Sequence, residues 1–161
     1  MQTRLSLKII VMIALCAGSV ISTARAVDYS QPINNAARIA GFLYTQTAIL
    51  AECADYDKQN ARSYSNLMSE YIEENKNLTD RIMTIMRTET FRTGHTFEGL
   101  SNDLSVVKNR ARNDVGKMRR ENPNFLNICR AQEDAHKRGL GNYRPIREKY
   151  PDQMRVIDDW K

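Results

Sequence analysis

Apolar residues recur at steps of three and four positions along most of the chain beyond residue 34, which is the spacing of one face of an α-helix. Polar, glycine-containing or proline-containing segments divide this pattern into four stretches. Asn34 or Asn35 is expected to cap the first helix and Asn122 the fourth, with Pro123 at the first position of that helix. We therefore expect an all-α fold with helices over residues 34–56, 61–91, 96–121 and 123–138.

The second stretch has the most regular apolar stripe. The stripe passes through Asn75 and Leu78 without a change of phase, which favours one continuous helix over residues 61–91. Such a helix would be about 45 Å long, since each helical residue adds 1.5 Å. The alternative is a break at Asn77, with Thr79 capping a second piece.

Residues 142–161 form a tail that differs from the rest of the chain. Tyr150 precedes a proline, which favours the start of a new helix. Met154, Ile157 and Trp160 then recur every three residues, as in a short amphipathic helix. The sequence allows this tail either to pack on the helical domain or to contact a partner.

Residues 1–26 have the features of a cleavable export signal. Arg4 and Lys8 precede an apolar run over residues 9–21, and an Ala-x-Ala sequence then ends at Ala26. This run is shorter than the roughly 20 residues that a membrane-spanning helix needs, so cleavage before Val27 is favoured over a retained anchor. We expect the mature protein to be periplasmic or secreted, without stable insertion into a membrane.

Cleavage would leave two cysteines, Cys53 and Cys129. An even number of cysteines in an oxidising compartment indicates one disulfide rather than two free thiols. In an up-down bundle the first helix ends at the pole where the fourth begins, so these two residues would lie at nearly the same height. The sequence thus predicts an up-down four-helix bundle over residues 27–141, closed by the Cys53–Cys129 disulfide.

The charge balance argues against nucleic acid as a partner. The whole chain has 24 basic and 19 acidic residues, but Arg4, Lys8 and Arg25 lie within the export signal, which leaves 21 basic residues and a net charge of +2. That charge is small for a protein that binds a polyanion. It is also unevenly spread, because residues 27–100 carry a net charge of −3 and residues 101–161 one of +5.

The sequence contains none of the common catalytic motifs, and we expect neither an enzyme nor a bound cofactor. It has no glycine-rich phosphate loop, no G-x-S-x-G and no H-E-x-x-H, and its two histidines, His95 and His136, have no partner at a ligand spacing. Met83 and Met86 are weak candidates for a Cu(I) site, because thioethers are soft ligands. Methionine more often fills gaps in a core.

Two sets of residues are candidates for binding a partner protein. Lys108, Arg112 and Arg119 share one flank of the third predicted helix, where they could instead pair with neighbouring helices and fix the register between them. The second set lies in the tail and consists of aromatic residues of the kind that anchor protein interfaces: Tyr143, Tyr150 and Trp160.

These features favour an exported, non-enzymatic protein-interaction module, such as a periplasmic adaptor, a chaperone-like protein, a secretion accessory or a toxin-neutralising protein. Its partner would be another exported or envelope protein with an acidic face, and the sequence leaves homo-oligomers open. The alternative is a helical bundle of the periplasm that binds a small molecule or copper between its helices.

Overall fold

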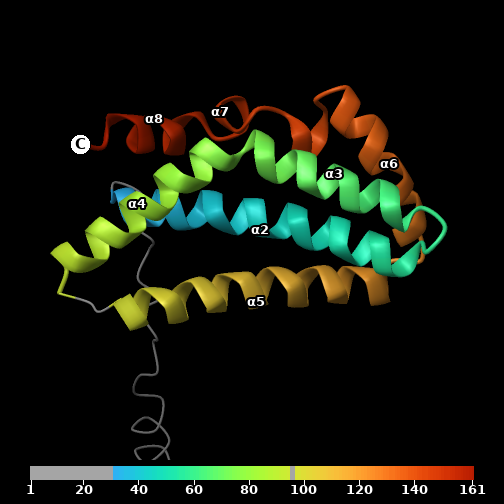
Figure 1. Cartoon of the computed structure of the whole chain (residues 1–161), viewed down its shortest axis with the longest axis horizontal. Coiled ribbons are helices and arrows are strands. Elements are labelled where there is room, and N and C mark those ends of the chain that lie inside the picture. Colours follow the sequence, from blue (N-terminus) through green and yellow to red (C-terminus); the bar gives the residue numbers. More distant parts are fainter. Residues whose placement is uncertain (1–30, 95–96) are drawn as a thin grey trace, which may run out of the picture.

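The computed structural model describes residues 31–94 and 97–161, and all regular structure in these ranges is helical, which confirms the all-α class (Figure 1). The predicted export signal, His95 and Thr96 lie outside the described residues. No helix in the described ranges combines the length and the hydrophobicity needed to cross a bilayer. The elements in chain order are α2 (Pro32–Tyr56), α3 (Ala61–Glu74), α4 (Lys76–Arg92), α5 (Phe97–Glu121), α6 (Phe125–Lys137), the 3₁₀ turn η1 (Gly141–Tyr143), α7 (Ile146–Lys149) and α8 (Pro151–Asp159).

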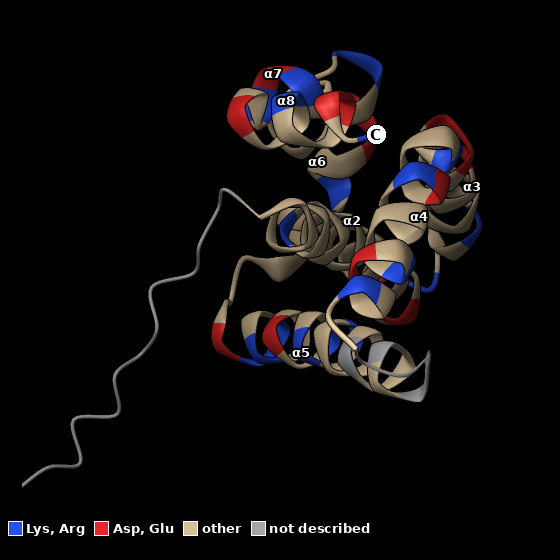
Figure 2. Ribbon diagram, turned by 90° about the vertical axis from the view of Figure 1, so that its left-hand side faces the viewer, with Lys and Arg blue, Asp and Glu red and all other residues tan. Residues whose placement is uncertain are grey.

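The long helix α2 lies at the centre of the molecule, and the other helices pack around it on three sides (Figure 2). α3 and α4 cover one side, α5 a second, and α6 with the C-terminal α8 a third. Because it is surrounded, α2 buries a wider sector than a single apolar stripe. Its buried residues are Asn35, Ala36, Ile39, Ala40, Leu43, Gln46, Ala48, Ile49, Leu50 and Cys53.

The arrangement departs from a simple four-helix bundle. The chain keeps an up-down path, but the second predicted helix is divided into α3 and α4, and the fourth is the short helix α6, which η1, α7 and α8 follow. Neither α3 nor α6 forms an extensive contact with α5, although all three pack on α2. The molecule is therefore organised around one central helix, whereas the helices of a regular bundle share the core more equally.

The core forms two clusters along α2. The first surrounds the N-terminal half of α2 and includes the tail: Ala36, Ile39, Ala40, Leu43, Tyr71, Ile82, Ile85, Met86, Ile146, Met154 and Ile157. The second surrounds the C-terminal part of α2 and consists of Ala48, Ile49, Cys53, Tyr64, Val115, Phe125 and Cys129. Because Met154 and Ile157 belong to the first cluster, the last helix packs on the helical domain.

The predicted disulfide is confirmed. Cys53 near the end of α2 and Cys129 in α6 are bonded, with their Cα atoms 5.3 Å apart. Both residues are fully buried in the second cluster. The bond therefore holds the first turns of α6 against the C-terminal end of α2, as the sequence predicted.

The predicted continuous helix over residues 61–91 is wrong, because the chain breaks at Asn75, between α3 and α4. The side-chain amide of Asn75 donates a hydrogen bond to the carbonyl oxygen of Tyr71 at 2.8 Å, and the backbone N–H of Asn75 approaches the same oxygen at 3.2 Å. Similar bonds to the preceding turn occur at Thr45 and Thr84 within unbroken helices, so this bond alone does not account for the break. Beyond Asn75, α4 turns away from the line of α3 toward α5 (Figure 1).

The first described helix begins earlier than predicted. Gln31 is the N-cap of α2 and Pro32 its first residue, so neither Asn34 nor Asn35 caps the helix. Proline fits this position, because its fixed φ suits a helix and the missing N–H would have no partner in the first turn. The backbone N–H groups of both asparagines instead donate to the carbonyl oxygen of Gln31.

The fourth predicted helix begins two residues later than predicted. α6 starts at Phe125 with Asn124 as its N-cap, and Pro123 lies in the preceding turn. The side-chain oxygen of Asn122 accepts a hydrogen bond from the backbone N–H of Asn124 at 2.8 Å. This Asx turn reverses the chain between α5 and α6, which explains why Pro123 is not helical.

Two glutamines interrupt otherwise apolar helix faces, and they bond to each other. Gln46 of α2 is 1% exposed, and its side-chain amide donates to Oε1 of Gln132 in α6 at 3.1 Å. The hydroxyl of Tyr143 donates to the same oxygen at 3.1 Å, and Nε2 of Gln132 donates to the carbonyl oxygen of Ile128 at 2.8 Å. Since buried polar groups need partners, this network fixes the position of α6 and η1 on α2.

Candidate functional site

A groove runs along α2 between α3–α4 on one side and α5 on the other, and we call it the interhelical groove. α3 and α5 both pack on α2 but hardly contact each other. The groove consists of two adjoining hollows of about 310 and 220 Å³ that share Tyr44, Thr47 and Lys108. Its other lining residues are Ala40, Leu43, Ala48 and Ala51 of α2, Met68, Ile72, Asn75, Thr79, Ile82 and Met83 of α3, α4 and the junction between them, and Arg112 of α5.

The groove is mainly apolar and long enough to hold a short helix. Its floor on α2 extends from Ala40 to Ala51, a distance of about 16 Å at 1.5 Å per residue. Ala48 and Thr47 are small, which keeps the floor low between the two walls. At the rim, Ile72 of α3 is 52% exposed. An exposed isoleucine indicates a binding surface when it adjoins other apolar area, and Ile72 adjoins the apolar groove.

The charged residues of the groove are both basic. Lys108 and Arg112, which the sequence indicates as candidates, stand one turn apart on α5 and line the groove. Neither forms an ion pair within the described part of the chain, and no Asp or Glu is among the described lining residues. The α5 wall therefore presents two positive charges beside an apolar floor.

Arg119, the third candidate on this helix, is engaged within the domain. Its guanidinium donates to Glu52 at 2.7 Å and to Asp55 at 2.8 Å, both on α2, and lies 5.2 Å from the ring centre of Tyr56. Hydrogen bonds from Lys58 and Arg119 lower the pKa of Asp55 to about 2, so this carboxylate stays charged at neutral pH. Arg119 thus joins α5 to α2, and the structure does not place it in the groove.

The aromatic candidates in the tail point into the domain. Tyr143 is half-buried and bonds to Gln132, as described above. Tyr150 packs edge-on against Phe42 of α2, with ring centres 5.3 Å apart. The indole N–H of Trp160 donates to Oε1 of Glu89 in α4 at 2.7 Å. These side chains hold the tail on α2 and α4, and they lie apart from Lys108 and Arg112.

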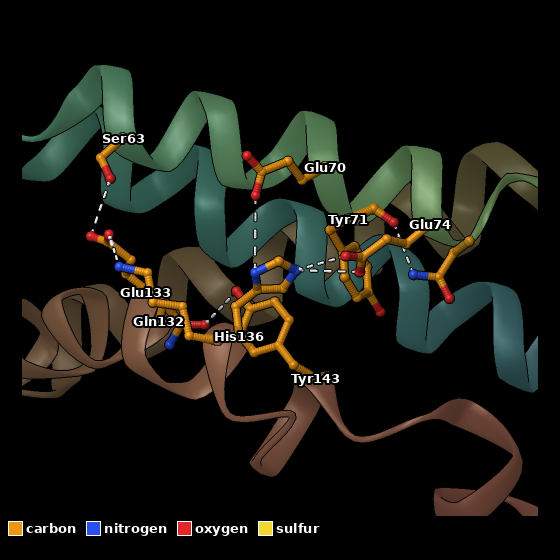
Figure 3. Close-up of polar contacts among 10 residues, drawn as sticks. Ser63, Glu70, Tyr71, Glu74, Gln132, Glu133, His136 and Tyr143 are labelled. Atoms are coloured by element: carbon orange, nitrogen blue, oxygen red, sulfur yellow. Dashed lines mark hydrogen bonds and ion pairs between the residues drawn. The ribbon is translucent and has the colours of Figure 1, made fainter.

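A polar cluster joins α3 to α6 (Figure 3). Nε2 of His136 lies 3.2 Å from both carboxylate oxygens of Glu74, and its Nδ1 lies 4.0 Å from Glu70. The ring of Tyr143 packs edge-on against the imidazole at 5.1 Å. Ser63, the nearby hydroxyl, contacts Glu133 instead of His136, so the cluster does not assemble a nucleophile and base.

This cluster was not predicted, because in the sequence His136 has no partner at a ligand spacing. A signal was present, because Glu70 and Glu74 are one helical turn apart and so face the same way. Their pairing with a histidine of α6 needs the fold to be known. The cluster links α3 to α6 through polar contacts.

The two methionine candidates have different surroundings. Met86 is 3% exposed in the first core cluster, while Met83 lines the interhelical groove. No group of three or more His, Cys, Asp and Glu side chains in residues 31–94 and 97–161 is arranged to hold a metal ion. Both methionines contribute apolar surface at these positions.

Comparison with known proteins supplies no relative from which a function could be transferred. No protein-family model, curated protein or solved structure is significantly similar to this chain. The function is therefore inferred from the interhelical groove and its charges.

Proposed function

We propose that this protein is an exported, non-enzymatic interaction module whose interhelical groove binds an apolar segment of another exported or envelope protein. The observation that carries this proposal is an apolar groove with Lys108 and Arg112 on one wall and no acidic residue in its described lining. The Cys53–Cys129 disulfide supports export, since disulfides persist in oxidising compartments. Adaptor, chaperone-like, secretion-accessory and toxin-neutralising roles would each use such a surface.

The chemistry of the groove indicates the chemistry of its ligand. An amphipathic helix of about three turns would match the 16 Å floor and place its apolar side chains against α2. Lys108 and Arg112 would then lie beside one flank of that helix, where aspartate or glutamate side chains complement them. We therefore propose a partner segment with an apolar face and an acidic flank.

The helices would serve this function as a bundle-like scaffold. α3 and α4 can be taken as one bent helix, and the segment from α6 to α8 as the fourth, interrupted helix of the bundle's path. With that grouping, the chain supports the up-down order of a disulfide-closed four-helix bundle. Each wall of the groove packs on α2, which supports a groove that exists before the ligand binds. A preformed site avoids the cost of ordering both partners.

A titration followed by NMR tests the proposal. The probe is a helical peptide of about 12 residues with a leucine and isoleucine stripe flanked by glutamates, added to the ¹⁵N-labelled, oxidised protein. We expect chemical-shift changes at Thr47, Ile72 and Met83, and none beyond the noise in α8. The substitution Ile72→Glu should weaken binding tenfold or more, because it places a charge against the apolar ligand face.

Val106→Glu is the matched control. Val106 of α5 is 64% exposed and does not line the groove, so the same change of apolar for acidic side chain should leave the affinity within about twofold. Shift changes centred on the tail, or equal losses from both substitutions, would exclude the groove as the binding surface.

A further inference from the structure

A second cavity lies between the junction of α3 with α4 and the C-terminal elements η1, α7 and α8. Its volume is about 500 Å³, which is within the range of small-molecule sites. Among lining residues it shares only Asn75 with the interhelical groove. Residues of α3 and α4 form one wall and residues of η1, α7 and α8, with the segment between them, form the other.

The hydroxyl group of Tyr71 lacks a partner in this region. Tyr71 is 4% exposed, and its hydroxyl forms no hydrogen bond with any described residue. In Figure 3 the hydroxyl points away from α3 toward the C-terminal segment that forms the opposite wall of the cavity. Burial, with the nearby Tyr143, raises the pKa of Tyr71 above its ordinary value, so the group stays protonated at neutral pH. It is a hydrogen-bond donor without an acceptor, which is rare for a buried polar group.

The cavity wall also carries an excess of positive charge, because three arginines and two acids line it. Of its two acids, Asp158 pairs with Arg147, and Glu74 pairs with the histidine of α6. The guanidinium of Arg81 donates to backbone carbonyl oxygens near the end of α8, which are uncharged. Arg144 is exposed and forms no ion pair with any residue in the described ranges. Arg144 is thus the guanidinium group of the wall that is left for an anion.

The chain itself adds a further positive charge near Arg144. Burial and the charge of Arg144 both lower the pKa of Lys149, which shows that the two cations lie close enough to repel. The Lys149 ammonium contacts an asparagine side chain and the face of Phe42, and neither carries a negative charge. An anion bound beside Arg144 would relieve this repulsion.

We propose that this cavity binds a small organic anion with an apolar tail. Its anionic group would pair with Arg144 and accept a hydrogen bond from the Tyr71 hydroxyl. Its tail would lie against Leu78, Ile146 and Met154, which supply the apolar part of the wall. Carboxylate and phosphate head groups share this chemistry, and the proposal does not depend on the interhelical groove being a protein-binding site.

Calorimetric titration of the oxidised protein with octanoate, octyl phosphate, 1-octanol and inorganic phosphate tests the proposal. We expect octanoate or octyl phosphate to bind at least tenfold more tightly than 1-octanol, which lacks the charge, and than inorganic phosphate, which lacks the tail. The variants Tyr71→Phe and Arg144→Gln should each weaken binding of the anion about tenfold or more, since each removes a bond to a charged group. Arg155→Gln, on the exposed side of α8, is the matched control and should not change it.

Thermal unfolding without ligand separates binding from stability. Tyr71→Phe should not lower the melting temperature, because the hydroxyl it removes has no partner to lose. Equal affinity for 1-octanol and octanoate, or an unchanged affinity of Tyr71→Phe for octanoate, would overturn the proposal. NMR chemical-shift changes that octanoate causes only at residues of the interhelical groove would also overturn it.

Discussion

Replacing both Cys53 and Cys129 with alanine is expected to lower the free energy of unfolding by about 4 kcal/mol, the loop-entropy value for a cross-link that joins residues 76 apart. Alanine suits both positions, because each cysteine is fully buried and a serine hydroxyl would have no partner. The loss should appear in global unfolding, because the cross-link acts mainly on the unfolded chain.

Urea unfolding followed by circular dichroism measures this loss. The midpoint should fall by roughly 2 M, given the usual urea dependence for a domain of this size. A reducing agent should produce a similar shift in the wild-type protein and none in the Cys53→Ala, Cys129→Ala variant. A change of less than about 1 kcal/mol would mean that packing alone holds α6 on the central helix.

The substitution Ile157→Ala is expected to cost about 3 kcal/mol, within the range for truncating a fully buried isoleucine. Ile157 is 0% exposed in the first core cluster, where the tail meets α2 and α4. The loss should be as large as for a residue in the middle of the domain, because the tail is part of the same core. Arg155→Ala, two residues away on the solvent side of α8, should change the stability by no more than about 0.5 kcal/mol.

Trp160 supplies a local measurement of the same effect. It is the chain's one tryptophan, and its indole bonds to Glu89 of α4, so its fluorescence reports whether the tail is docked. Fluorescence and circular dichroism should give the same unfolding midpoint in the wild type and should shift together in Ile157→Ala. A fluorescence transition that precedes the loss of helix would show the tail to be a separate, weakly attached arm.

The sequence was sufficient to predict the all-α class and the disulfide, because apolar spacing and an even cysteine count are local or simple signals. It was not sufficient to predict the break at Asn75, since an asparagine in the stripe is equally compatible with a straight helix. The central position of α2 was also missed. Ala36, Ala40 and Ala48 are good helix formers whether exposed or buried, so their burial depends on neighbours that the pattern does not identify.

The candidate site was predicted in part for a related reason. A helical wheel places Lys108, Arg112 and Arg119 on one flank, but it does not say which neighbour each side chain meets. Arg119 meets two carboxylates of α2, whereas the other two line the groove. The small floor residues Thr47 and Ala51 carry no sequence signal of a binding site, because a groove depends on the spacing of its walls.

Selection of an acidic partner by Lys108 and Arg112 is tested most directly by the dissociation constants of two peptides, one with glutamates and one with lysines flanking the same apolar stripe. We expect the wild type to favour the acidic peptide by about tenfold, and the variant Lys108→Glu, Arg112→Glu to favour the basic one. The control Arg110→Glu, Lys117→Glu changes the same charges on the opposite face of α5, where both residues are exposed, and should keep the wild-type preference. An unchanged preference for the acidic peptide in Lys108→Glu, Arg112→Glu would contradict the proposed recognition.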